Sequence, residues 1–242
     1  MRIALISDLH GNAVSLRAVL DALAGERVDR IVCLGDVATL GPAPSEVIGR
    51  LVDLGCPCIL GNHDAFLLDA DLIRTYTESP LIVQSVAACR ASLGRTEIEA
   101  LASFQPTLSM DLDGADLGLF HGSPRSHTED LLATTASEQL DEALGSRRQA
   151  VMAGGHTHLQ MVRQHRGTLL VNPGSLGLPF ETYAQGGPPK ILAHAEYAIV
   201  ECVRGSIGIT LRRLPVDRAA LAAALDGWDN PLRPYLVQQY TS

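Results

Sequence analysis

The sequence predicts an α/β fold with a parallel sheet, because short apolar runs alternate with amphipathic helices from its first residues onward. The expected strands cover residues 2–7, 30–34 and 57–60, and the expected helices cover 13–24 and 44–54. Parallel strands joined by right-handed crossovers follow from this order. With 242 residues, 46% of them apolar, the chain is expected to form a single domain, 1–242, around one sizeable core.

The helix expected over 13–24 has the clearest pattern. Its leucines and valine at positions 16, 19, 20 and 23 recur at the spacing of one helix face, and Gly25 suits the helix end. Asn12 precedes it, and we interpret this side chain as an N-cap rather than a phosphate contact. The face formed by the apolar residues is therefore expected to pack on the sheet.

Residues from about 65 to 106 show a helical and less regular pattern, which predicts a helical insertion within the domain. Thr96 and Glu99 have the spacing of a capping box that opens a short helix. The insertion leaves the sheet beside His63 and returns near His121, so it is the expected source of substrate choice.

Strand patterns resume after the insertion and then give way to one more helix. Arg204-Gly205 is a plausible hairpin turn, and the tail after Pro231 is expected to be irregular because a second proline follows it. The expected strands are 117–120, 150–153, 169–171, 197–203 and 206–211, and the expected helix is 217–225.

Composition excludes several classes of function. The net charge is −8 and Lys190 is the only lysine, so no basic run exists for nucleic acid or an anionic membrane, and nucleic acid is an unlikely partner. No apolar stretch reaches membrane-spanning length and no signal peptide is evident, which predicts a cytoplasmic protein without a membrane partner. The five cysteines include no CxxC pair, and we expect them to be reduced.

Five short polar blocks follow apolar runs, and they contain five of the eight histidines. Taken singly, each has an ordinary interpretation as a turn residue, a helix cap, a loop residue or a satisfied core histidine. The blocks are Asp8-Leu9-His10, Gly35-Asp36, Gly61-Asn62-His63-Asp64, His121-Gly122 and Gly155-His156-Thr157-His158.

Taken together, the blocks predict a metal centre. Ligands of α/β sheets gather at the carboxyl ends of strands, so these oxygen and nitrogen donors are expected at one edge of one sheet. In an extended backbone, the alternation in Asp8-x-His10 and His156-x-His158 directs both side chains of each pair the same way. Imidazole and carboxylate ligands without thiolate suit Mn, Fe, Zn, Co or Ni.

The ordered blocks resemble the calcineurin-like metallophosphoesterase superfamily, and among its members they are most similar to the small bacterial and archaeal YfcE-like phosphodiesterases. Asn172-Pro173-Gly174-Ser175 resembles a further turn of that family. The resemblance implies a four-layer α/β/β/α sandwich, two divalent metal ions with Mn expected first, and a hydrolase that attacks a phosphate ester with a metal-bridging hydroxide. The substrate is then expected to be a small phosphorylated molecule.

The resemblance also implies a role for each residue. His63 would contact the substrate phosphate and help the leaving group depart, while Asp64 would either orient His63 or cap the following helix. Asn62 would reach the substrate as well as a metal ion. Apart from the resemblance, the position of Arg125 soon after His121 would let it clamp a second phosphate or remain a solvated loop residue. The implied ligands are Asp8, His10 and His158 for one ion, Asn62, His121 and His156 for the other, and Asp36 for both.

Other functions stay open on the same fold. A dinucleoside polyphosphate hydrolase or a protein phosphatase begins with a similar Asp8-Leu9-His10-Gly11-Asn12 block, but the segment from Gly35 to Gly41 departs from the GDxxDRG block of protein phosphatases. A catalytically silent interaction module, as in a eukaryotic retromer subunit, is a further alternative. The apolar residues of the insertion could also form a surface for self-association, which would give a homo-oligomer.

Overall fold

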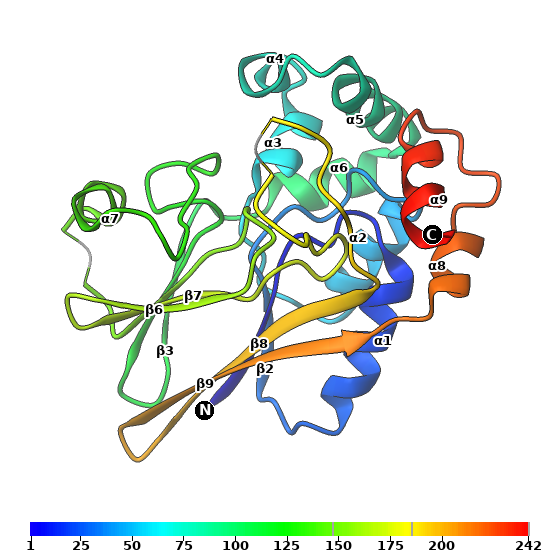
Figure 1. The fold of residues 1–242 in the computed structure, drawn as a ribbon. Helices are drawn as coiled ribbons and strands as arrows, with labels where there is room; N and C mark the ends of the chain where they lie inside the picture. Colours follow the sequence, from blue (N-terminus) through cyan, green and yellow to red (C-terminus); the bar gives the residue numbers. More distant parts are fainter. Residues whose placement is uncertain (147, 185, 242) are drawn as a thin grey trace.

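The computed structural model describes residues 1–146, 148–184 and 186–241, and within them two β-sheets face each other (Figure 1). The first sheet has the strand order β2-β1-β8-β9, and the second has the order β3-β4-β5-β7-β6. The strands are β1 (Arg2–Ile6), β2 (Arg30–Cys33), β3 (Leu108–Asp111), β4 (Asp116–Leu119), β5 (Val151–Ala153), β6 (Met161–His165), β7 (Thr168–Asn172), β8 (His194–Val203) and β9 (Ser206–Pro215).

Helices cover the outer side of each sheet (Figure 1). The first two helices lie behind the first sheet with the last two, α7 lies beyond the second sheet, and the helices of the expected insertion lie together beside one end of the sandwich. The helices are α1 (Ala13–Ala24), α2 (Pro44–Asp53), α3 (Asn62–Leu68), α4 (Leu72–Tyr76), α5 (Pro80–Ser92), α6 (Arg95–Ala102), α7 (Ser137–Leu144), α8 (Arg218–Ala223) and α9 (Arg233–Thr241).

Three apolar cores separate four layers. Alternate residues of β1 point to opposite sides, so Ala4 and Ile6 pack with the helices behind the first sheet while Ile3 and Leu5 pack against the second sheet. Leu140 of α7 belongs to a third cluster on the far side of the second sheet. Each such buried leucine or isoleucine stabilises the fold by about 1.5–3 kcal/mol. The predicted α/β/β/α sandwich is therefore confirmed.

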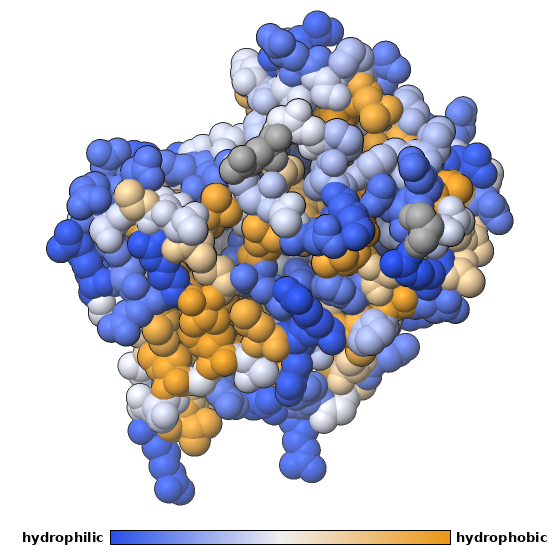
Figure 2. Space-filling model, viewed as in Figure 1, coloured by the Kyte–Doolittle hydropathy of each residue, from blue (hydrophilic) through white to orange (hydrophobic). Residues whose placement is uncertain are grey.

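The core between the sheets reaches the surface along one open side of the sandwich. Figure 2 shows apolar side chains gathered there, between β7 and β9. Leu169 of β7 and Ile207 and Ile209 of β9 are half-buried residues that pack on the core between the sheets. This surface patch is thus an extension of the core.

Several parts of the sequence form other structures than expected. Residues 57–60 make only isolated bridges, one between Cys33 and Cys58 and one between Ile59 and Gln105. The C-terminal tail, expected to be irregular, forms α9, with Pro234 in the first turn, where a helix leaves its N–H groups unbonded. Thr96 does not cap α6, because the helix already begins at Arg95.

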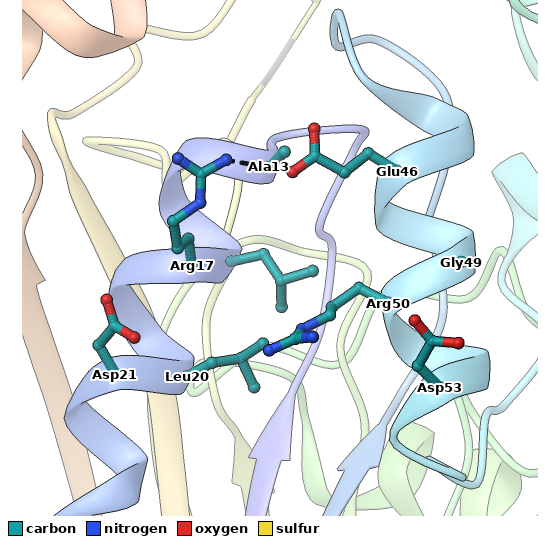
Figure 3. A pocket seen from close by; sticks show the side chains of 9 residues that line it. Ala13, Arg17, Leu20, Asp21, Glu46, Gly49, Arg50 and Asp53 are labelled. Atoms are coloured by element: carbon teal, nitrogen blue, oxygen red, sulfur yellow. Dashed lines mark hydrogen bonds and ion pairs between the residues drawn. The ribbon is translucent and has the colours of Figure 1, made fainter.

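The helix α1 forms over the predicted residues, and Asn12 caps it by accepting a hydrogen bond from the Ser15 N–H at 2.9 Å. An open groove of about 490 Å³ separates α1 from α2, and an ion pair of 3.1 Å between Arg17 and Glu46 crosses it (Figure 3). None of the predicted metal ligands lines this groove.

Among the described residues, every helix is too short or too polar to cross a membrane.

Candidate metal centre

Strands of both sheets position the predicted ligands. Asp8 follows β1 and Asp36 follows β2 of the first sheet, whereas His121 follows β4 and His156 follows β5 of the second. The expectation of a single sheet edge is therefore wrong. Strands β3 to β7 build a sheet of their own, and its face-to-face packing on the first sheet brings the ends of all four strands together.

The first ligand cluster consists of Asp8, His10 and His158, all buried, with candidate ligand atoms within 4.8 Å of one another. The Nε2 atoms of the two histidines are 3.1 Å apart, and His158 Nε2 lies 3.4 Å from Asp8 Oδ1. His10 and His158 are 148 residues apart in the chain. The fold thus creates a three-ligand site from distant segments.

The second cluster consists of Asp36, His121 and His156, again buried and within 4.8 Å. Asn62 joins it, because its Oδ1 lies 3.1 Å from His121 Nε2. Asp36 Oδ2 is 3.3 Å from His121 Nε2 and 3.9 Å from His10 Nε2 of the first cluster. Asp36 therefore lies between the two clusters.

Much of the centre is built on strained backbone, since left-handed φ angles are uncommon outside glycine. The extended backbone that would direct both side chains of Asp8-x-His10 and of His156-x-His158 the same way is absent, because both named residues of each pair have left-handed φ angles. The angles are 53° at Asp8, 48° at His10, 57° at Asp36, 69° at His156 and 58° at His158.

Hydrogen bonds fix which nitrogen of His121 and of His158 faces the centre. Nδ1 of His121 lies 2.6 Å from the Leu34 carbonyl oxygen, and Nδ1 of His158 lies 2.6 Å from that of Leu178. Each Nδ1–H donates to its carbonyl, which leaves Nε2 as the ligand atom. His156 Nε2, by contrast, lies 3.4 Å from the carboxylate oxygen Oδ1 of Asp130.

Asp130 is a supporting residue that sequence reasoning missed. Its other carboxylate oxygen accepts a hydrogen bond of 2.5 Å from the Tyr183 hydroxyl. Both residues lie in irregular segments outside the polar blocks, so no local pattern in the sequence marks them.

The electrostatics of the clusters favour a cation. Burial lowers the pKa of His10 to about 3 and that of His156 to about 4, so both rings are neutral, as metal ligands must be. Burial also opposes protonation of His121, but Asp36 and Asp8 outweigh it and raise its pKa to about 10. The carboxylates thus stabilise positive charge between them.

The donor set fits divalent metal ions. Asp8 Oδ1 is buried without a hydrogen-bond partner, an arrangement that costs free energy unless a cation compensates it. The side chains supply carboxylate, amide and imidazole donors and no thiolate, which suits borderline metals such as Mn, Fe or Zn.

His63 lies beside both clusters and is held from two sides. Its Nδ1 is 2.8 Å from the hydroxyl of Thr39, and its backbone N–H donates to Asp36 Oδ1 at 2.8 Å. Burial lowers the pKa of the ring. Thr39 is the second supporting residue that sequence reasoning missed, although it lies only three residues after Asp36.

Asp64 bonds to backbone groups. Its carboxylate accepts hydrogen bonds from the N–H groups of Asp36 at 2.8 Å, Val37 at 2.9 Å and Gly61 at 3.0 Å. The Gly61 bond belongs to the cap of α3, and the other two tie that helix to the loop that carries Asp36. The carboxylate therefore fixes the relative position of two ligand-bearing loops.

Arg125 pairs with Glu129, with its Nε 2.9 Å from Glu129 Oε2. The Arg125 side chain is half exposed and does not line the cavity beside the clusters. The structure thus brings together the seven predicted ligands and His63, and it holds Arg125 in a separate surface ion pair.

A sandwich of two sheets with paired Asp and His clusters at the strand ends defines a class of metal-dependent hydrolases. The chain belongs to the calcineurin-like phosphoesterase superfamily, whose domain model matches residues 1–202. It is accordingly a metal-dependent phosphoester hydrolase.

Similar proteins cover most of the chain. An uncharacterized Methanocaldococcus jannaschii protein is 26% identical over 73% of this chain and 76% of its own length. A hypothetical protein of Pyrococcus horikoshii has a similar structure, with a TM-score of 0.81, 16% identity and coverage of 98% of this chain and 96% of its own. A metallophosphoesterase of Sphaerobacter thermophilus gives a TM-score of 0.74 with 24% identity over 99% and 98% of the two chains.

The predicted likeness to YfcE is also found. The Escherichia coli phosphoesterase Yfce matches 87% of this chain and 98% of its own, with a TM-score of 0.50 and 22% identity. The Pyrococcus and Sphaerobacter structures match a larger share of this chain with higher TM-scores.

Proposed function

We propose that this protein hydrolyses a small phosphate ester at a dinuclear centre of two divalent cations, with Mn²⁺ as the expected metal. The observation that carries the proposal is the position of Asp36 Oδ2, 3.3 Å from His121 Nε2 and 3.9 Å from His10 Nε2. A carboxylate between two three-ligand clusters is suited to hold two cations at once. Such a pair acidifies the attacking water and neutralises phosphate charge when it is bound.

The side chains of the protein orient the ester and handle the leaving group. Asn62 presents its amide at the edge of the second cluster, where it serves as a ligand and borders the substrate. If the Thr39 hydroxyl donates to His63 Nδ1, the ring carries its proton on Nε2. That N–H then donates to a phosphate oxygen or to the departing oxygen, a contribution worth about 10²- to 10⁴-fold in rate.

The test is metal content and turnover measured on the same samples. We expect about two Mn²⁺ per chain, and metal-dependent release of p-nitrophenol from bis-p-nitrophenyl phosphate, p-nitrophenyl phosphate or both, the better substrate separating diesterase from monoesterase. Asp36→Asn should lose metal and turnover together, and His63→Ala should lose turnover at full metal content. Arg95→Gln, in the exposed pair of Arg95 with Glu99, is the control for surface substitution.

A single tightly bound ion per chain in the wild type would contradict the dinuclear centre. Full occupancy by two ions without turnover of either ester would contradict hydrolysis of simple esters. A cytoplasmic location and a homo-oligomeric state remain part of the proposal, and size-exclusion chromatography with light scattering addresses the second.

A further inference from the structure

A cavity of about 220 Å³ opens beside the metal centre. Its polar end is formed by side chains of the centre itself, so a phosphate group held there borders the cavity directly. These side chains are His10, Asp36, Asn62, His63, His156 and His158.

The remaining walls are mostly apolar and come mainly from three separate segments, together with Leu40 from the loop that carries Asp36. Tyr76 and Ile82 belong to the helical insertion, Phe180 to the loop that follows β7, and Tyr235 and Leu236 to α9. The Tyr235 hydroxyl donates to the Pro189 carbonyl oxygen and so ties α9 to the loop. The cavity therefore forms only where the helical insertion, the loop after β7 and the C-terminal helix α9 pack together.

Aromatic rings border the passage between the metal centre and the cavity. The Tyr76 ring centroid lies 6.1 Å from that of His156 and 6.4 Å from that of His63. Phe180 stacks on His158 with a centroid distance of 4.1 Å and an interplanar angle of 23°. A flat group entering from the metal centre would pass between aromatic surfaces.

The charge of the lining restricts what the cavity binds. Among the described residues that line it, none is a lysine or an arginine, so a second phosphate would enter without a partner of opposite charge. The volume is also below the roughly 300–1,000 Å³ of pockets that hold drug-sized ligands. An uncharged group of about one ring system fits both the small volume of the cavity and its lack of cationic side chains.

From these observations we infer that the ester carries an uncharged, ring-containing organic group next to its phosphate, and that this cavity binds the group and selects it. The inference rests on the proposed function, because it assigns the phosphate to the metal centre. It excludes polyphosphate chains as preferred substrates and assigns specificity to Tyr76, Ile82 and Phe180.

Binding of two phosphonates that cannot be hydrolysed tests the inference. Titration calorimetry on Mn²⁺-loaded protein compares phenylphosphonate with methylphosphonate, which share the metal-binding group and differ in the ring. Burial of the ring should make phenylphosphonate bind about tenfold more tightly or better. Equal affinities, or no binding of phenylphosphonate, would overturn the inference.

Substitutions test whether the preference for phenylphosphonate over methylphosphonate arises in the cavity. Ile82→Trp fills the cavity and should bring the affinity ratio close to one while methylphosphonate affinity stays unchanged. The matched control is Leu81→Trp, since Leu81 is its exposed neighbour on α5 and does not line the cavity, so the ratio should persist. Tyr76→Ala, at a partly exposed position, should also reduce the ratio.

An unchanged ratio in both Ile82→Trp and Tyr76→Ala would place the ring elsewhere and overturn the inference. The two proposals fail in different ways. Turnover of p-nitrophenyl esters without a phenyl preference would leave the hydrolytic function and remove the cavity's role. Tighter binding of phenylphosphonate by a protein without turnover would support the role of the cavity and contradict the hydrolytic function.

Discussion

The Thr39 hydroxyl lies 2.8 Å from His63 Nδ1, and both residues are buried. Thr39 is carried by the loop after Asp36, whereas His63 is in the first turn of α3. The contact therefore couples the loop that carries Asp36 to the ring that we propose contacts the substrate. If the hydroxyl is the donor in this contact, it also selects the tautomer of that ring, because a donor at Nδ1 keeps the ring proton on Nε2.

Replacing Thr39 by valine removes this donor while keeping the side-chain shape. We expect Thr39→Val to lower kcat by about tenfold, the equivalent of one lost hydrogen bond, at unchanged metal content. Thr39→Ser retains the hydroxyl and should recover most of the rate. The measurement is steady-state turnover of a p-nitrophenyl ester with metal analysis of each variant, and a fully active Thr39→Val protein would remove the orienting role.

Asp64→Asn should destabilise the protein even without metal. The Asp64 carboxylate accepts three backbone N–H bonds, and an asparagine amide must turn its NH₂ group toward at least one of those donors. A buried mismatch of this kind costs about 1–3 kcal/mol of unfolding free energy. Urea denaturation of the metal-free proteins measures it, and equal midpoints for variant and wild type would show that the carboxylate is not a structural anchor.

Local sequence patterns predicted a large part of the fold and of the candidate metal centre. The apolar stripe of α1 and the polar blocks at strand ends are encoded within a few residues, so α1 and the residues that form the two clusters could be predicted from sequence. The short strands β3 and β6 carry weak patterns and depend on their partners β4 and β7, and they were missed.

Contacts between distant segments explain what the sequence could not reveal. Asp130 matters only because folding brings it to His156, and no spacing rule connects the two residues. Five ligands adopt left-handed backbone angles that only the surrounding structure can enforce, which is why the extended alternation failed. Pro234 allowed a helix because it falls in the first turn.

Gly155→Ala should disrupt the first metal cluster. A Cβ at this position would lie 1.9 Å from Ser7 Oγ and 2.6 Å from Asp8 Oδ2, too close without displacement of the ligand. We expect Mn²⁺ affinity to fall by roughly tenfold or more, since a displacement costing about 1.4 kcal/mol already has that effect. Titration calorimetry measures the affinity.

Gly49→Ala is the matched control for that substitution. Gly49 lies in α2, and a Cβ added there would meet nothing within 4 Å. Alanine should therefore stabilise the helix by up to about 1 kcal/mol and leave metal binding unchanged. Wild-type metal affinity in Gly155→Ala would mean that the strand end can shift without moving Asp8.

Metal binding at neutral pH should release protons. In the metal-free protein Asp36 and Asp8 overcome the effect of burial and raise the pKa of His121 to about 10, and Asp8 likewise raises the pKa of His158. The His121 ring is therefore protonated at pH 7, below its pKa, and the carboxylate of Asp8 favours a proton on His158 as well. A cation must displace a proton from Nε2 before that atom can bind it.

Affinity for Mn²⁺ should consequently rise with pH between about 6 and 8, because each proton displaced costs less as the pH approaches the raised pKa. Calorimetry at one pH in buffers of different ionisation enthalpy counts the protons, and we expect at least one per chain. His121→Asn removes the ring whose pKa is raised to about 10 together with a predicted ligand, so both the proton count and the affinity should fall. Mn²⁺ binding to the wild type with no proton release and no pH dependence would show that the carboxylates do not hold protons on these histidines.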